Sequence, residues 1–502
     1  MKSYFDKKLV VFELANNHMG FIDHGIKIIN TYGKLIKNYR SKFDFAFKLQ
    51  YRHLSSFIHK DFKKRKDLHY VKRFMETKLS INDFNKLIAT IKKNKFKAIS
   101  TPFDEPSVQL IEKQKLDFIK IASCSFNDWP LLEAVAKVNK PIILSTAGTT
   151  KKAIDEVVSF LANRNKNFAL LHCVAEYPTP TNKLHLNQID FLKNRYENIP
   201  IGYSSHEFPN NFENVKIAVA KGAHIFEKHV GIESEAFKLN KYSLNPNQTK
   251  LWLESLSQAV EICGNINRER TINIDEQKSL RSLQRGVYLK KNIKKNQKIN
   301  LNDVYFSFPP QKNQILANEF SKYLTLIAKN KINKDKPLLK KTVKVKNNRN
   351  LIYDIINKIS HFVKKANVNL PKKIDIELSY HYGLEKFYKY GLSMFTIVNR
   401  EYCKKILVSL PKQIHPAQYH KKKEETFNVI YGNVDLVLDG KKKHLYTGDV
   451  VTIKPGQVHQ FSSKKGSVIE EISTTHYKSD SYYIDESINQ NKNRKTVANF
   501  WM

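Results

Sequence analysis

The sequence predicts an α/β protein that begins with a (β/α)8 barrel and continues into two β-rich regions. Three observations support this prediction. Eight short apolar runs alternate with helical patterns over roughly the first 265 residues, about the length that such a barrel needs. A polar side chain stands at the end of each run. The rest of the 502-residue chain shows short β-rich runs with polar turns, and a chain of this length is expected to form several domains.

The eight apolar runs are the strand candidates. In chain order they are Leu9–Leu14, Phe43–Gln50, Lys97–Thr101, Phe118–Ile121, Pro141–Ser145, Phe168–His172, Ile199–Tyr203 and Ala223–Val230. The helical patterns that follow them are Gly25–Ile36, Ile81–Lys93, Ser107–Lys113, Leu131–Val138, Lys151–Leu161, Asn187–Asn194, Asn214–Lys221 and Asn247–Ile262. Because parallel strands need crossover connections, this order predicts a TIM barrel over residues 1–270.

The polar residues at the strand ends predict a common site. They are Glu13, Gln50, Thr101, Ser123, Ser145, His172, Ser204 with His206, and His229. Barrels of this kind place their chemistry at the carboxyl ends of the strands. Any one of these residues could instead cap a helix or belong to a turn. A polar residue at the end of every one of the eight strand candidates, however, indicates a function.

Two lysines and two histidines indicate what the site binds. Lys48 and Lys120 lie inside apolar runs, and an inward ammonium needs an anionic partner because burying it unpaired is costly. With nearby hydroxyls they would bind phosphate and carboxylate, whereas the alternative is two lysines that snorkel at strand edges. His206 and His229 each end an apolar run, and imidazole suits Mn, Fe, Co or Zn. Taken alone, the stretch around them favours two unrelated histidines with structural partners, and the other strand ends reverse that interpretation.

The composition limits the partners and the compartment. The formal net charge of +39 suggests a nucleic-acid or anionic-membrane function. The lysines are spread along the whole chain, however, without a basic stripe interleaved with aromatic residues, so we expect no nucleic-acid partner. The four cysteines form no pair motif, and no apolar run is long enough to cross a bilayer. These features predict a soluble cytoplasmic protein without a membrane partner.

Eight short motifs follow one another through the predicted barrel. They are Glu13–Gly20, Lys48–Gln50, Ser100–Phe103, Lys120–Ser123, Ile143–Thr146, Leu171–Cys173 with Tyr177–Pro180, Gly202–His206 and Glu227–His229. In order and spacing this series resembles the sialic acid synthase family, which includes the N-acetylneuraminate, legionaminate and pseudaminate synthases. The resemblance covers about residues 1–265.

The resemblance implies that phosphoenolpyruvate condenses with an N-acyl aldose to give a nonulosonic acid and phosphate, for a surface polysaccharide. It implies a divalent metal, most often Mn²⁺, held by His206 and His229. The residues that would hold phosphoenolpyruvate are Lys48, Thr101, Lys120, Ser123, Ser145 and Ser204. Glu13 and Gln50, together with Lys48, would act near the reacting aldehyde. Glu13 is the candidate for proton transfer at the sugar.

Several positions depart from the family pattern. Ser125 stands where an acidic residue is frequent, Val174–Glu176 replaces a dipeptide that contains Asn, and Glu233–Leu244 lacks the usual Asp. These positions face the sugar more than phosphoenolpyruvate. The reaction type is therefore better supported than the identity of the acceptor sugar.

Residues 280–345 combine short β-rich runs with polar turns. On composition alone this region could be any small basic module. After a synthase barrel it resembles the SAF (antifreeze-like) domain, which implies a domain-swapped homodimer in which this module covers the partner's barrel mouth. Ser307–Gln311 lacks the Arg that helps the family hold the sugar. Residues 346–374 are predicted to form a basic helical linker with a solvated charged face.

Residues 375–486 alternate strands and turns, and a polar tail over residues 487–502 follows. Gln418, His420, Glu424 or Glu425, and His459 are ligand types that suit one octahedral metal on a barrel wall, although such a cluster can also be surface charge. With turn glycines at matched offsets, the pattern resembles the two cupin motifs, with Gln418 in place of the first His. We therefore expect a C-terminal cupin β-barrel with a candidate second divalent metal site.

Three functions compete at this stage. The first is the metal-dependent synthase described above. The second is a non-catalytic or regulatory sugar-binding protein that keeps the barrel and a sugar-handling cupin, and the set of Lys48, Lys120, His206 and His229 argues against it. The third is a nucleic-acid-binding protein, which the dispersed charge argues against.

Overall fold

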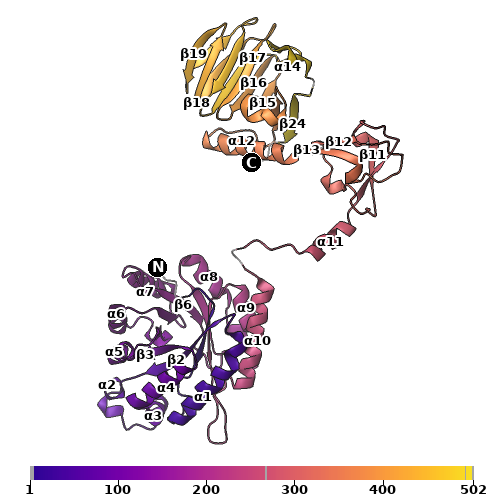
Figure 1. Ribbon diagram of the computed structural model, residues 1–502. Coiled ribbons are helices and arrows are strands. Elements are labelled where there is room, and N and C mark those ends of the chain that lie inside the picture. The colour runs from indigo at the N-terminus through magenta and orange to yellow at the C-terminus, as the bar shows by residue number, and fades with distance from the viewer. Residues whose placement is uncertain (1–4, 266–267, 492, 500–502) are drawn as a thin grey trace. The chain divides into compact units, whose positions relative to one another are not determined.

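The computed structural model describes residues 5–265, 268–491 and 493–499 (Figure 1). The chain forms two compact units, Met1–Thr271 and Ile272–Met502, and each has buried apolar cores of its own. Within the described ranges, no helix is long and apolar enough to cross a membrane.

Eight parallel strands close a barrel in sequence order, as the alternation predicts. They are β1 (Leu9–Glu13), β2 (Asp44–Tyr51), β3 (Lys97–Pro102), β4 (Phe118–Ile121), β5 (Ile142–Ser145), β6 (Phe168–Cys173), β7 (Ile201–Ser205) and β8 (Ile225–His229). β1 pairs with both β2 and β8, which closes the ring. The predicted (β/α)8 fold of the first unit is confirmed.

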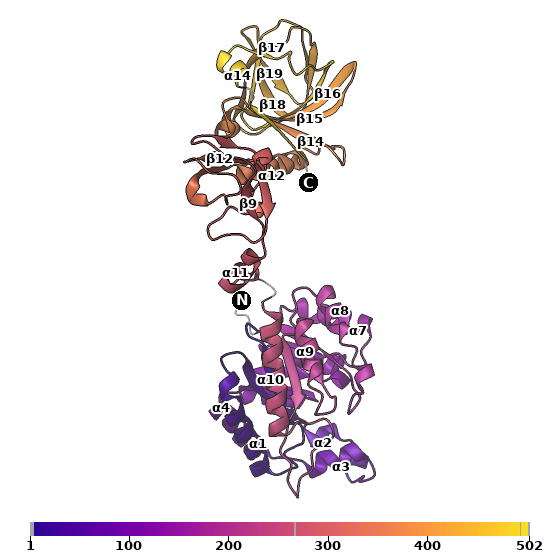
Figure 2. The same cartoon turned by 90° about the vertical axis from the view of Figure 1, so that its right-hand side faces the viewer.

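Helices surround this barrel, and several begin at side chains that cap their first turn. They are α1 (Ile22–Leu35), α4 (Ile81–Lys93), α5 (Glu105–Lys113), α6 (Trp129–Lys137), α7 (Lys151–Ala162), α8 (Asn187–Arg195), α9 (Glu213–Ala220) and α10 (Pro246–Cys263). Ser80 and Asp83 form a capping box at α4, and Asn245 and Gln248 form another at α10. Figure 2 shows α10 beside α9, and the two helices are in contact.

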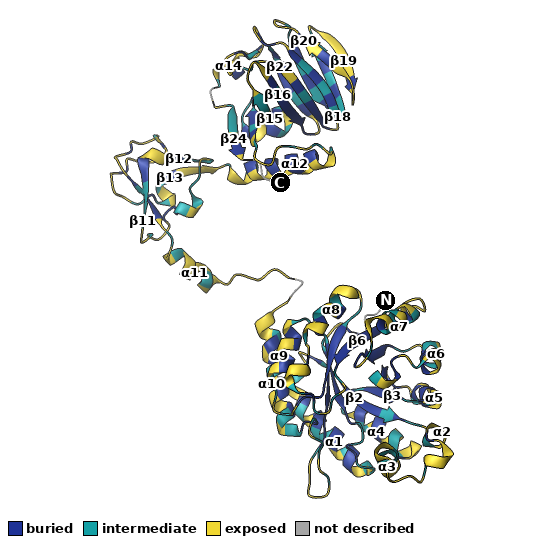
Figure 3. Cartoon of the chain, turned by 180° about the vertical axis from the view of Figure 1, so that it is seen from behind, coloured by how far each residue is buried: buried dark blue, intermediate teal, exposed yellow. Residues whose placement is uncertain are grey.

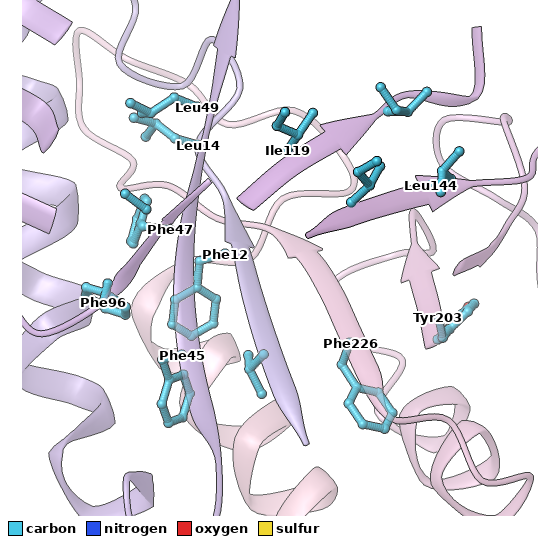
Figure 4. Packing of buried hydrophobic residues seen from close by; sticks show 14 of the residues in the cluster. Phe12, Leu14, Phe45, Phe47, Leu49, Phe96, Ile119, Leu144, Tyr203 and Phe226 are labelled. Atoms are coloured by element: carbon cyan, nitrogen blue, oxygen red, sulfur yellow. The ribbon is translucent and has the colours of Figure 1, made fainter. Parts of the chain in front are cut away.

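Side chains alternate along each strand and so form two buried layers. One cluster contains Leu9, Val11, Ala46, Ile99, Phe118, Ile143, Ala169, Leu171 and Ile225, which point into the barrel. The intervening residues pack outward against the helices, and Figure 4 shows Phe12, Phe45 and Phe47 in this outer layer. The inward series continues toward the carboxyl ends of the strands, where it reaches Glu13 on β1 and Lys48 on β2.

The connection between β2 and α4 is more regular than predicted. It contains the helices α2 (Leu54–Phe57) and α3 (His69–Glu76), where the sequence indicates only a long connection. Phe57 joins this segment to the barrel, with its ring centroid 6.2 Å from that of Phe74 and 6.4 Å from that of Phe103. Strand β7 begins two residues later than predicted, since the intervening Pro200 has no N–H for a strand ladder.

The second unit begins with α11 (Ile274–Ser282) and a small β-rich region. Its strands are β9 (Gly286–Leu289), β10 (Lys298–Ile299), β11 (Val304–Ser307), β12 (Leu324–Ala328) and β13 (Val343–Asn347). Val287, Leu289 and Leu326 are fully buried in a core that belongs to this region alone. The expected compact β-rich module is present, and its assignment as a SAF domain stays a prediction.

The remaining strands form the C-terminal cupin barrel. They are β14 (Asp375–Tyr380), β15 (Gly391–Asn399), β16 (Tyr402–Ser409), β17 (Gln413–Tyr419), β18 (Glu425–Leu438), β19 (Lys441–Tyr446), β20 (Val450–Ile453), β21 (His459–Ser463), β22 (Ser467–Thr474), β23 (Tyr482–Tyr483) and β24 (Lys495–Asn499). The short helices α13 (Phe387–Tyr390) and α14 (Glu486–Gln490) lie between them. Buried residues alternate with half-buried ones in the first part of β18, and with half-buried or exposed ones in the last part of β22 (Figure 3), as expected when one face of a sheet lines a core.

Two segments that the sequence placed outside the cupin are part of it. The helix α12 (Arg349–Lys365) forms within the predicted linker, but its apolar stripe is buried rather than free. Ile355, Ile359 and Val363 pack in one cluster with sheet residues such as Val408. The predicted polar tail contains β24, which pairs with β14. Both differences arise because the packing partners lie far away in the sequence.

Candidate active site

The carboxyl ends of the barrel strands bring most of the predicted residues together. Glu13 lies opposite Lys48 on one side and opposite His229 on the other. Gln50 lies opposite Thr101 on the next strand. Because the register is parallel, these side chains share one end of the barrel.

A buried network of charges forms the floor of this site. The Nζ atom of Lys48 lies 2.5 Å from Oε2 of Glu13 and 2.8 Å from Oε2 of Glu227. Lys120 donates from Nζ to both oxygens of Glu227, at 2.9 and 3.0 Å. Ser204 donates from Oγ to Oε1 of Glu227 at 2.9 Å. Both predicted lysines therefore point inward, and Glu227 is the anionic partner that their burial requires.

The two carboxylates of the network differ in their affinity for a proton. Burial raises the pKa of Glu13, and Lys48 offsets this only in part. Burial acts in the same direction on Glu227, but the ammonium groups of Lys120 and Lys48 outweigh it and hold its pKa below the usual range. Glu227 is thus a permanent anion, whereas Glu13 is suited to carry a proton.

Several hydroxyl groups near the network, unlike that of Ser204, form no hydrogen bond with its charged groups. The Oγ1 atom of Thr101 and the Oγ atom of Ser145 are buried and make no hydrogen bond within the described structure. Ser123 is half-buried, and its Oγ accepts a hydrogen bond from the N–H of Ala147 at 3.1 Å. Unsatisfied buried hydroxyls beside two ammonium groups are suited to bind the oxygens of an anionic ligand.

His206 and His229 lie side by side, with their ring centroids 5.3 Å apart. The Nδ1 atom of His206 donates to the carbonyl oxygen of Val174 at 3.1 Å, which leaves the lone pair of Nε2 free. Burial lowers the pKa of His206 to about 4 and that of His229 well below its usual value. Both rings are therefore neutral near pH 7, the form that binds metals.

The histidine pair fits a divalent metal with open coordination positions. The Nδ1 atom of His229 is buried without a hydrogen bond. Among the described residues, no acidic, Cys or further His side chain completes a set of three ligands with this pair. Water or substrate oxygens would therefore complete the coordination of a metal bound there.

Two aromatic residues enclose the pair: Tyr177, which begins one of the predicted motifs, and Tyr242, which was not predicted for the site. The ring centroid of Tyr177 is 4.5 Å from that of His206, and Tyr242 packs edge-on against both imidazoles. Tyr242 lies in the segment Glu233–Leu244, where the family pattern is altered. That segment therefore contributes a wall of the site although it lacks the usual Asp.

Two of the predicted strand-end residues, His172 and Gln50, already have hydrogen-bond partners outside the charge network. His172 uses Nε2 to contact the carbonyl oxygen of Leu184 at 2.7 Å, so this ring has a structural partner. Gln50 is half-buried, and its Oε1 accepts a hydrogen bond from Nη2 of Arg52 at 3.1 Å. Arg52 lies at the same end of the barrel and is another residue that the sequence did not predict for the site.

The cupin chamber holds the second predicted cluster. His420, Glu425 and His459 are buried, and each offers a ligand atom within 4.8 Å of the other two. The Nε2 atom of His459 lies 3.0 Å from Oε1 of Glu425 and 3.2 Å from Nε2 of Gln418. The prediction of Glu424 as a ligand is wrong, because Glu424 is exposed. Strand β18 begins at Glu425, and it is the side chain of Glu425 that points inward.

Buried lysines adjoin this cluster. Lys423 forms ion pairs with Glu425 and, at 2.9 Å, with Glu471. Lys405 contacts Glu471 at 3.2 Å. The carboxylate of Glu425 is therefore shared between an ammonium group and the histidines.

Two acceptor atoms in the chamber remain open. The Nδ1 atom of His420 contacts the carbonyl oxygen of Asp480, so its Nε2 lone pair points into the chamber. This Nε2 makes no hydrogen bond within the described structure, and Oε1 of Glu425 has only the 3.0 Å contact with Nε2 of His459, which is a hydrogen bond only when that nitrogen carries the proton. Open acceptors of these types fit a divalent metal, although Lys423 competes for the same carboxylate.

Comparisons with known proteins agree with this geometry. The sequence pattern of the NeuB family matches residues 38–268, and that of the cupin domain matches residues 406–469. N,N'-diacetyllegionaminic acid synthase of Campylobacter jejuni is 31% identical over 254 residues, which are 50% of this chain and 74% of that protein. An uncharacterised protein of Methanocaldococcus jannaschii is also 31% identical, over 65% of this chain and 90% of its own length.

A solved structure extends the comparison. The crystal structure named as spore coat polysaccharide biosynthesis protein E, from Chromobacterium violaceum, superposes with a TM-score of 0.65 at 46% identity, covering 67% of this chain and all of that one. The barrel and its mouth define a synthase-type enzyme of the (β/α)8 class. The chain belongs to the NeuB family and carries a C-terminal cupin domain.

Proposed function

We propose that this protein condenses phosphoenolpyruvate with an N-acyl aldose to give a nonulosonic acid and phosphate, for surface polysaccharide synthesis. The observation that carries the proposal is the pairing of Lys48 and Lys120 with open hydroxyls, next to two neutral histidines. The names of the relatives, a legionaminic acid synthase and a spore coat polysaccharide protein, support the same chemistry.

The lysine side of the site suits phosphoenolpyruvate. An ammonium group has three donors, and the contacts with Glu13 and Glu227 leave at least one on each lysine. These donors, with the hydroxyls of Thr101, Ser123, Ser145 and Ser204, would bind the phosphate and carboxylate oxygens. Glu227 fixes both ammonium groups in place and keeps them charged.

The histidine side suits the acceptor aldehyde. His206 and His229 would hold a divalent metal, for which we propose Mn²⁺, and the bound metal would polarise the aldehyde oxygen as a Lewis acid. The enol carbon of phosphoenolpyruvate attacks the aldehyde carbon, and Glu13 donates the proton that the new hydroxyl needs. Water then adds to the former enol carbon, and phosphate leaves with cleavage of its C–O bond.

The test is phosphate release by the purified full-length protein. We expect phosphate release that needs both Mn²⁺ and an N-acyl aldose. The mass of the product should equal phosphoenolpyruvate plus the aldose plus water minus phosphate. A panel of such aldoses that gives no release would overturn the proposal. It would favour instead a non-catalytic sugar-binding protein.

We further propose that residues 280–345 act as a SAF domain in a homodimer. The support is the family resemblance together with the compact core of this region. Light scattering in solution should give twice the mass of one chain, and a monomeric mass at micromolar concentration would contradict the homodimer.

We also propose a second divalent metal in the cupin, held by His420, Glu425 and His459 with Gln418. The open acceptors of His420 and Glu425 support this site. The full-length variant with both His206 and His229 changed to Ala should still bind one metal per chain after dialysis. Metal-free protein would contradict the cupin site.

A further inference from the structure

Arg52 lies one residue beyond β2, at the same end of the barrel as Lys48 and Gln50. Its guanidinium carbon is 4.1 Å from the ring centroid of Phe74 and 3.7 Å from that of Phe103. Phe74 belongs to α3 and Phe103 follows β3, so two separate segments clamp the guanidinium between ring faces. The position of this charge at the mouth is therefore fixed by packing.

The guanidinium group has no anionic partner. Within the described residues Arg52 forms no ion pair, and its one hydrogen bond goes from Nη2 to Oε1 of Gln50 at 3.1 Å. Its Nε atom is buried without a hydrogen bond. Burial lowers the pKa of Arg52 to about 10, so the group remains charged near neutral pH. Arg52 is half-buried, and a charge that is partly removed from water is costly unless a ligand pairs with it.

The nearby carboxylates are already engaged. Asp104 accepts hydrogen bonds from the backbone N–H groups of His53 and Ser107, at 2.7 and 2.9 Å. Glu13 pairs with Lys48 and accepts from the N–H of Ala15 at 2.6 Å. Both carboxylates raise the pKa of Arg52 from a distance, but neither forms an ion pair with it within the described residues.

Other arginines of the same barrel show what a stacked guanidinium does elsewhere. Arg164 lies 3.7 Å from the ring centroid of Phe160 and also pairs with Glu133 at 3.3 Å. Arg195 forms a bidentate pair with Asp155 at 2.7 and 2.6 Å. These two exposed arginines have carboxylate partners, whereas half-buried Arg52 at the mouth forms no ion pair within the described residues.

We propose that Arg52 binds a phosphate or carboxylate group of the acceptor, so that the acceptor is an anionic N-acyl aldose. The inference rests on the proposed synthase function. Nε and an adjacent Nη of a guanidinium form a fork that matches two oxygens of such a group. Lys48 and Lys120 serve the phosphoenolpyruvate side, and Arg52 instead contacts Gln50, the residue expected beside the aldehyde.

The test compares acceptors that differ in one anionic group. The full-length protein is assayed with N-acetylmannosamine, its 6-phosphate and N-acetylmannosaminuronic acid, at saturating phosphoenolpyruvate. The wild type should prefer one of the two anionic aldoses by at least about tenfold in kcat/KM. Arg52→Met keeps the apolar packing between the rings and should raise KM for that aldose about 10- to 100-fold. Arg52→Lys should recover part of the loss.

Two further measurements make the result specific. KM for phosphoenolpyruvate and for the neutral aldose should change less than about twofold in Arg52→Met, since these substrates lack the acceptor's anionic group. Arg164→Met, which removes another stacked guanidinium, should change no kinetic constant. Equal melting temperatures of wild type and Arg52→Met would confirm that the fold is intact.

Several outcomes would overturn the inference. They are equal use of neutral and anionic aldoses by the wild type, unchanged KM for the anionic aldose in Arg52→Met, or a rise in KM for phosphoenolpyruvate alone. If no aldose supports phosphate release, the proposed synthase function fails separately. Calorimetric binding of N-acetylmannosamine 6-phosphate then decides the role of Arg52: binding that is lost in Arg52→Met supports it, and no binding or equal binding overturns it.

Discussion

The barrel mouth and the cupin chamber use the same residue types in different arrangements. Each has two buried histidines, a buried glutamate and lysines nearby. In the barrel, Lys48 and Lys120 bind Glu227, and neither histidine forms an ion pair with that carboxylate within the described residues. In the cupin, Glu425 contacts both His459 and Lys423.

The difference lies in which atoms remain open. The barrel leaves hydroxyls and ammonium donors, which suit an anion, beside imidazoles that suit a metal. Among the described residues that line the cupin chamber, the open atoms include Nε2 of His420, Nδ1 of His415 and Oε1 of Glu425, and imidazole and carboxylate lone pairs suit a cation. The partner of the glutamate therefore decides what each site can bind, more than the list of residues does.

The largest expected effect is on the barrel histidines. His206→Ala or His229→Ala should lower kcat by at least about 10³-fold, because the Lewis acid would lose one of two protein ligands. The matched control is His224→Ala, a half-buried histidine just before β8, at the opposite end of the barrel from His229. Normal turnover in His206→Ala, measured by phosphate release, would remove the pair as the metal site.

Glu13 should give the next largest effect. Burial raises the pKa of this carboxyl, so its protonated form persists above the usual value of 4.5. As pH rises through the raised pKa, the general acid is lost and kcat should fall. Glu13→Gln should lower kcat about 10²- to 10⁴-fold and abolish that alkaline limb of the pH–rate profile. An unchanged limb in Glu13→Gln would assign the proton transfer to another group.

Glu227 tests whether the network needs its permanent anion. Glu227→Gln leaves Lys48 with Glu13 alone and Lys120 with no ion-pair partner among the described residues. The free energy of unfolding, measured by urea denaturation, should therefore fall by about 3–5 kcal/mol. Asp155→Asn, which breaks the ion pair with Arg195 on the barrel surface, should cost at most about 1 kcal/mol. Equal losses in the two variants would contradict the role of Glu227.

Lys423 gives the smallest expected effect and tests the cupin side of the comparison. Lys423→Met removes the ammonium that competes for Glu425, so metal affinity should rise by about tenfold or more. The measurement uses the variant that lacks His206 and His229, so that only the cupin metal is counted. Lys405→Met is the control, since Lys405 contacts Glu471. Equal affinities in the two lysine variants would show that Lys423 does not compete.

The sequence predicts the barrel well because its information is local. Each strand shows as an apolar run. The sequence left open whether Lys48 and Lys120 point inward, and the structure shows that they do, on the same strand faces as Ala46 and Phe118. Glu227 was missed because the next residue, Lys228, is also buried, where it pairs with Glu207 at 3.2 Å. Two adjacent charges in one strand do not reveal which of them faces the site.

The cupin was harder to predict because its details depend on strand register and distant packing. The choice between Glu424 and Glu425 requires the start of β18, which its pairing with β20 and β22 sets. Arg52 could not be recognised as a mouth residue, because its clamp comes from Phe74 and Phe103, which are remote in the chain.

The seating of α12 determines where this chain could be cut. A fragment spanning residues 375–486 would leave behind the helix that covers Phe395 and Val408, and also β24, which covers the edge of β14. It would expose an apolar groove and an unpaired strand edge to solvent, and both features promote self-association. A cupin fragment that keeps both α12 and β24 spans residues 349–499.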